Sequence, residues 1–166
     1  MARKLLNYDP IIALLRSKLL ANPAIANWDK WVDGEPIISP RYLDYPDQAT
    51  YPCITIYRDY GIRLKNRTGH EEGHYFIHGW LRPFEGGEGG SSDVVDDCSY
   101  LMNAVISTLS EDRVLGRQVK EVDMIRMVDS RCPCYEAQTR TYFFMTDWRI
   151  IYDSMMMFDF DNEIKE

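Results

Sequence analysis

Apolar residues recur at helical spacing near the start of the chain. The stripe is formed by Ile11, Leu14, Leu15 and Leu19, a pattern typical of one buried helix face. Asp9 is suited to cap this helix and Pro10 to open it, whereas Asn22-Pro23 should end it. We therefore predict a helix over residues 10–21.

A second and longer helical pattern covers residues 92–113. Its apolar stripe falls at steps of four, three, four and four residues: Val94, Cys98, Leu101, Val105 and Leu109. Ser92 or Asp93 is the expected N-cap. Asp96 and Asp97 follow within the first turns, where acidic side chains interact favourably with the helix dipole, and we expect them on the solvated face.

Four segments rich in β-branched and aromatic residues read as strands, namely 51–61, 73–84, 116–129 and 139–153. A short strand is also expected at "EPIIS", residues 35–39, inside a long connection over 23–52. Residues 62–73 read as a polar hairpin connection, the glycine-rich 85–92 as a flexible linker, and 130–138 as a turn.

The resulting order is helix, strand, strand, helix, strand, strand. Hairpin-paired strands with separate helices predict an α+β fold, with an antiparallel sheet of four or more strands and two main helices packed on one face. We expect one domain spanning residues 1–166, with a flexible loop at 84–92 and a C-terminal arm at 153–166.

Charge and composition narrow the classes of function. The chain has 166 residues and a formal net charge of −7, which argues against binding to a phosphate backbone through clustered Lys and Arg. No apolar run approaches the ~18 residues that a membrane span needs. The N-terminal residues do not fit a signal peptide, so we expect a cytosolic protein with reduced thiols at Cys53, Cys98, Cys132 and Cys134.

"HEEGH", His70 to His74, fits the H-E-x-x-H signature of zinc peptidases, which requires both imidazoles on one face of a helix. Gly73 disfavours a helix, and the following Tyr75 and Phe76 favour a strand. An extended chain would hold His70 and His74 ~13 Å apart, too far to share an ion. We interpret the segment as a turn entering a strand, with His74 or His78 as a polar surface residue.

Other candidate motifs have equally plain interpretations. Cys132-Pro-Cys134 lacks the second pair of a usual zinc site and reads as a tight turn. The loop after Pro83 lacks the G-K-[ST] ending of a phosphate-binding loop. Scattered carboxylates give no metal-site spacing. We predict no catalytic residue, cofactor or metal.

The order of elements, together with phrases such as "LLANPAIA", "YPCITIY", "HYFIHGW" and "RTYFFMTDWRIIY", resembles the tail-completion or tail-terminator proteins of long-tailed bacteriophages and related head–tail joining proteins. The resemblance covers about residues 8–152. It implies a homo-oligomeric ring, commonly a hexamer, that stops growth of the tail tube and joins it to the head connector in the virion neck, after assembly in the host cytoplasm.

In such a ring the partners would be other copies, the tail-tube protein and a connector or adaptor protein, and DNA would pass through without specific binding. Long, polar or Met-rich segments would supply the interfaces. The candidate residues are Arg63, Lys65, Arg67, Glu85, Glu88, Met155, Met156, Met157, Phe158 and Phe160. The alternatives are another adaptor, a tail-tube protein, or a small metal-dependent hydrolase built on "HEEGH".

Overall fold

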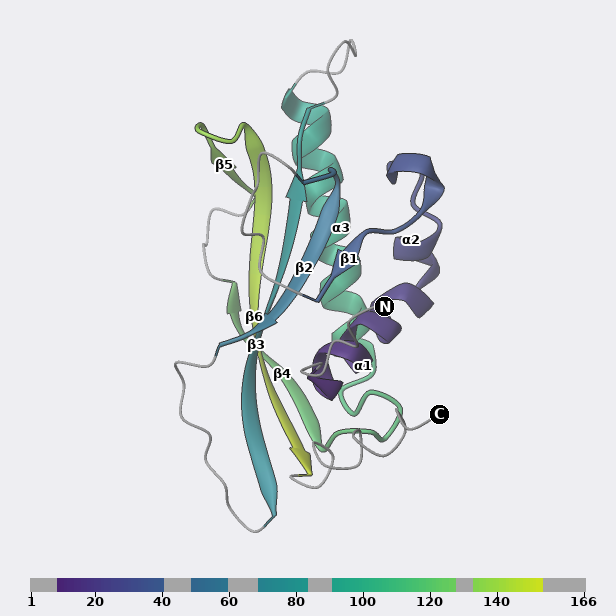
Figure 1. Cartoon of the computed structure of the whole chain (residues 1–166), viewed down its shortest axis with the longest axis vertical. Helices are drawn as coiled ribbons and strands as arrows, with labels where there is room; N and C mark the ends of the chain where they lie inside the picture. Colours follow the sequence, from purple (N-terminus) through teal and green to yellow (C-terminus); the bar gives the residue numbers. More distant parts are fainter. Residues whose placement is uncertain (1–8, 41–48, 60–68, 84–90, 128–132, 154–166) are drawn as a thin grey trace, which may run out of the picture.

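The computed structural model describes residues 9–40, 49–59, 69–83, 91–127 and 133–153. Ten elements follow one another along these segments: α1 Pro10–Ala21, α2 Pro23–Ala26, η1 Val32–Gly34, β1 Ile38–Ser39, β2 Cys53–Arg58, β3 His70–Leu81, α3 Ser91–Glu111, β4 Glu121–Met127, β5 Cys134–Glu136 and β6 Thr141–Asp153. Figure 1 shows their arrangement.

Helix α1 begins and ends where the sequence predicts. The Asp9 side chain accepts a hydrogen bond from the Ile11 amide, and Pro10 is the first helical residue. The helix ends at Ala21 because Asn22, with extended backbone, precedes Pro23. The Asn22 side chain then caps α2 by accepting from the Ala24 amide, so a helical turn lies within the predicted connection.

Helix α3 confirms the predicted apolar stripe but not the predicted cap. All five stripe residues are buried. The helix begins at Ser91, so Ser92 and Asp93 lie inside the first turn rather than at the N-cap. Several adjacent polar residues offer nearly equivalent helix starts, and the sequence alone does not rank them.

The strands form one six-stranded sheet in the order β1-β2-β3-β6-β4, with β5 paired to β6. All pairings are antiparallel except β1 with β2. The predicted α+β class is therefore confirmed, with a parallel edge added. Strand β3 begins at His70, before the predicted 73, and β5 occupies part of the predicted turn, because pairing with the long β6 extends both segments.

Strand β4 begins at Glu121 rather than Gly116. The residues before it cannot continue a strand, since Leu115, Gly116 and Arg117 have φ values of 46°, 66° and 66°. This left-handed backbone makes the chain turn sharply between α3 and β4. The predicted strand over 116–129 is thus shortened at its beginning.

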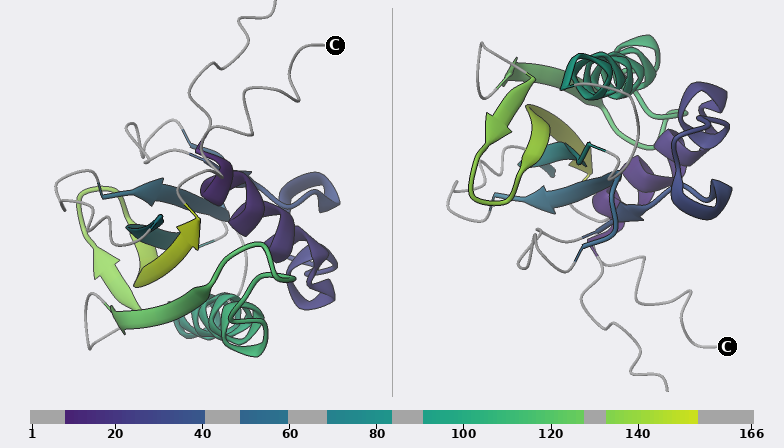
Figure 2. Two further views of the ribbon diagram at one scale, coloured as in Figure 1. Left: turned by 90° about the horizontal axis from the view of Figure 1, so that it is seen from below. Right: turned by 90° about the horizontal axis from the view of Figure 1, so that it is seen from above.

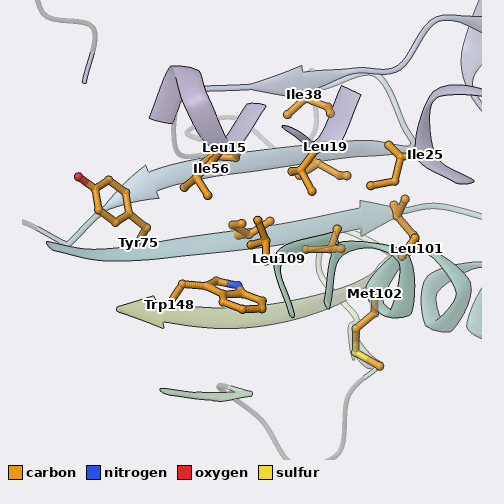
Figure 3. Close-up of a cluster of buried hydrophobic side chains, with 14 of the residues drawn as sticks. Leu15, Leu19, Ile25, Ile38, Ile56, Tyr75, Leu101, Met102, Leu109 and Trp148 are labelled. Carbon is orange, nitrogen blue, oxygen red and sulfur yellow. The ribbon is translucent and has the colours of Figure 1, made fainter. Parts of the chain in front are cut away.

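The two main helices lie over the same face of the sheet (Figures 1 and 2). Figure 3 shows Leu15 and Leu19 of α1 and Leu109 of α3 packed towards Ile56 and Trp148 of the sheet. Alternate residues of each strand face this core because successive side chains point to opposite faces.

The second face of the sheet carries its own aromatic cluster. Tyr57 stacks on Phe76 with ring centroids 5.1 Å apart, and His78 contacts the rings of Tyr57, Phe76 and Trp80 edge-on. The indole of Trp80 donates to the hydroxyl of Thr55 at 3.1 Å. Buried polar groups therefore lie on this face too.

Candidate functional site

The "HEEGH" segment is extended rather than helical, as predicted, but all of it lies in strand β3, where a turn was expected before residue 73, and it is paired along its length with β6. His70 lies opposite Asp153 and His74 opposite Arg149. His74 interacts with Glu72 at 3.2 Å, its neighbour on the same strand face. No group of three metal-binding side chains occurs in the described part of the chain. The helical geometry that H-E-x-x-H chemistry requires is not the geometry of this segment.

Charged side chains instead form a row across β3, β6 and β4. Arg149 lies 2.7 Å from Asp123 and 4.0 Å from Glu72. Asp123 also pairs with Arg113, which reaches Glu121 at 3.6 Å. These groups are partly exposed, so each pair contributes at most ~1 kcal/mol. The row fits a role in strand register.

His78 departs from the predicted surface position. It is 2% exposed, and neither ring nitrogen has a hydrogen-bond partner. Burial lowers the pKa of His78 to about 4, so the imidazole is neutral at physiological pH. His74, the alternative, is half-buried. The rings of Tyr57, Phe76 and Trp80 contact His78 and remove it from solvent.

A concavity of about 480 Å³ lies between α3 and the segment after α2. It is lined by Asn27, Trp28, Asp29, Lys30, Asp96, Asp97 and Tyr100. The rings of Trp28 and Tyr100 stack with centroids 5.9 Å apart and an interplanar angle of 18°. The Tyr100 hydroxyl donates to the Ala24 carbonyl at 3.0 Å, which fixes the ring although 45% of Tyr100 is exposed.

This concavity, called here the acidic concavity, has three carboxylates against one ammonium group. Partial burial raises the pKa of Asp97, with further contributions from Asp29, Asp93 and Asp96, while Lys30 opposes them. Asp97 is half-buried rather than fully solvated, which corrects the predicted surface role. The arrangement combines an aromatic surface with an excess of negative charge, features that favour a cationic group.

A second concavity, of about 570 Å³, lies beyond the other end of α3. Its lining consists of Val114, Arg117, Gln118, Val119, Lys120 and Asp153. The turn over residues 112–120, called here the basic turn, is anchored by the fully buried Leu115. Asp112 accepts from the Gly116 amide at 2.8 Å and pairs with Lys18 at 3.3 Å. Arg117 and Lys120 are exposed.

The outer edge of the sheet is formed by β4. A bulge occurs between Met124 and Arg126, and the neighbouring Met124 and Ile125 are 40% and 43% exposed. In a regular strand, consecutive side chains point to opposite faces of the sheet. A bulge interrupts this alternation, so two consecutive side chains can both be exposed. Two large apolar side chains are thus exposed together at an edge strand.

Cys53 and Cys98 are buried, and burial raises the pKa of Cys53 to about 12. The predicted core position of Cys98 is confirmed. Cys134 belongs to strand β5 and not to a turn, and Cys132 lies outside the described residues.

The interface residues predicted from the sequence also lie outside the described residues: Arg63, Lys65, Arg67, Glu85, Glu88, Met155, Met156, Met157, Phe158 and Phe160. Sequence reasoning selected long polar or Met-rich segments and missed both concavities. In the sequence, the adjacent acids Asp96 and Asp97 mark the first concavity, and Gly116 followed by Arg117 marks the second. Neither pair indicates which distant residues lie beside it in the fold.

No protein-family model matches the chain, and the comparison with curated proteins gives no match. Of the helices that the structure describes, none has the length and apolar character needed to cross a membrane.

Proposed function

We propose that this chain is a structural protein of a bacteriophage neck or tail, which assembles with its own copies into a ring, hexameric in our proposal. The ring terminates the tail tube and joins it to the head connector. The support is that the resemblance implies an antiparallel sheet flanked by helices, and the chain has a mainly antiparallel sheet with α1 and α3 on one face.

The main structural observation in favour of self-assembly is the exposed edge strand β4. Met124 and Ile125 present adjoining apolar surface at a strand that ends the sheet path. Apolar side chains at an edge strand favour burial against another chain. The bulge twists the edge and works against open-ended strand addition, which suits a closed assembly better than a fibril.

The charge of the chain fits passage of DNA. With a net charge of −7, a ring of copies has no excess of cations to neutralise phosphates. Electrostatic repulsion acts over only ~8 Å at physiological salt, so acids lining the channel are the ones that matter. DNA would therefore slide through without specific binding.

The test is imaging of the purified chain by negative stain, with mass photometry to count subunits. We expect closed rings, and Ile125→Asp should shift the population towards monomers. Ala137→Asp, which adds the same charge at an exposed turn residue, should leave the rings intact. Long tubes would favour a tail-tube protein, and monomers would favour an adaptor; either result contradicts the ring.

The hydrolase alternative has a separate test, because "HEEGH" could hold zinc only after leaving β3. Metal analysis of the purified chain should find no stoichiometric zinc, and His74→Ala should leave the metal content unchanged. One zinc per chain that disappears in His74→Ala would contradict the structural role.

A further inference from the structure

We propose that neighbouring copies meet head to tail, with the basic turn of one copy seated in the acidic concavity of the next. This inference rests on the proposed function, since it names a second contact, besides the β4 edge, that would join subunits of the ring. The cationic groups are Arg117 and Lys120, and the receiving groups are Asp29, Asp96 and the exposed part of the Tyr100 ring.

The two surfaces lie towards opposite ends of α3 (Figure 1). Asp96 and Tyr100 belong to its first half, and the basic turn follows directly after Glu111. The helix from Asp96 to Glu111 spans ~22 Å, so the turn lies far from the concavity of its own chain. Two different patches on one subunit define a heterologous contact, which generates rings when the rotation between copies closes.

The charges of the two surfaces are complementary. Within the described segments, Arg117 and Lys120 form no ion pair, nor do Asp29, Asp96 and Asp97. Basic residues nearby behave differently, since Lys18 pairs with Asp112 and Arg113 with Asp123. The exposed charge is therefore mainly negative at the acidic concavity, where Lys30 is the opposing group, and mainly positive at the basic turn, which lies beside Asp153.

The aromatic pair suits a guanidinium group better than an inorganic cation. Trp28 holds the Tyr100 ring in place by stacking, and the exposed part of the ring lines the concavity. Arg stacks on aromatic surfaces and donates to carboxylates at the same time. Asp97, already partly buried, would gain a counter-charge when Arg117 of the neighbouring copy enters.

The basic turn is preorganised for such a contact. Leu115 and Arg117 both have left-handed backbone, which is costly for residues with a side chain. Buried Leu115 and the hydrogen bonds of Asp112, Val119 and Lys120 hold this conformation. Strained backbone that its surroundings fix in this way is often associated with function, and a rigid turn loses little entropy on binding.

Charge reversal gives a test that misfolding cannot imitate. One variant carries Asp29→Lys and Asp96→Lys, and the other carries Arg117→Glu and Lys120→Glu. Each should weaken self-association about tenfold or more by analytical ultracentrifugation, since two ion pairs each contribute up to ~1 kcal/mol. The chain with all four changes should associate again, as should a 1:1 mixture of the two variants.

The matched control is Arg140→Glu, because Arg140 is also exposed with left-handed backbone, φ 54°; it should associate like the native chain. Native-like association of both reversed variants, or no recovery in the chain with four changes despite native melting, would overturn the contact. If native rings form but reversal has no effect, the contact is wrong and the ring proposal stands. If the native chain forms no rings, the proposed function fails instead.

Discussion

Asp9 and Arg58 form an ion pair at 3.4 Å although 49 residues separate them, and their side chains are only 5% and 6% exposed. One carboxylate oxygen of Asp9 caps α1. The other accepts from the Tyr75 hydroxyl at 3.0 Å and faces Arg58. Burial and the charge of Asp9 raise the pKa of Tyr75, so the phenol remains a donor. A single side chain thus ties the first helix to β2 and β3.

The variant Asp9→Asn should remove the negative charge of Asp9 while keeping its role as the N-cap of α1. Asn is as good an N-cap as Asp, so α1 keeps its start while Arg58 loses its counter-ion. Removing one partner of a buried pair costs about 3–5 kcal/mol, and we expect that loss in the free energy of unfolding from urea denaturation.

The control for this prediction is Asp9→Asn combined with Arg58→Met. Removal of both charges should recover much of the loss, because no unpaired charge is left buried. A single Asp9→Asn variant as stable as the native chain would mean that the ion pair contributes nothing.

Gly79 should be intolerant of any side chain. It lies opposite Phe144 in the β3–β6 pairing, and a Cβ at this position would overlap the Phe144 ring. We expect Gly79→Ala to lower the free energy of unfolding by about 1–3 kcal/mol through overpacking. In a Phe144→Leu background the same change should cost much less, and equal costs in the two backgrounds would contradict the contact.

His78 should make stability depend on pH. Its pKa is about 4 in the folded chain, against 6.5 for an unperturbed imidazole. Between these values the unfolded chain binds more protons than the folded one, so stability rises with pH and is lost as pH falls from about 6.5 towards 4. Protonation of His78 should lower the free energy of unfolding by about 3 kcal/mol in total over this pH range.

His78→Leu should therefore flatten the stability curve between pH 4 and pH 6.5, measured by chemical denaturation at several pH values. At pH 7 it should equal or exceed the native stability, since a buried imidazole without partners is replaced by an apolar group. If the free energy of unfolding of His78→Leu depends on pH as steeply as that of the native chain, other groups cause the pH dependence.

Cysteine reactivity should separate buried from accessible thiols. In a Cys132→Ser chain at pH 8, Cys134 should react readily with an aromatic disulfide reagent. Cys53, whose pKa burial raises to about 12, has a thiolate fraction on the order of a thousandfold smaller than a free thiol. Cys53 and Cys98 should react only as the chain unfolds; rapid labelling of three thiols under native conditions would contradict this burial.

The sequence alone determined the two main helices and the class of fold. The stripe from Val94 to Leu109 and the Asp9-Pro10 start are local patterns, because helical hydrogen bonds join residues four apart. The extended state of "HEEGH" followed equally from Gly73 and the aromatic residues after it. The α+β class followed from the order of such local elements.

Tertiary structure alone decided which distant residues meet. The parallel β1–β2 pair, the strand at Cys134, the burial of His78 and the Asp9–Arg58 pair all depend on register between segments far apart in the chain. The acidic concavity likewise joins residues 27–30 to 96–100. Local spacing carries no information on such contacts, because packing and strand pairing fix them only when the whole core closes.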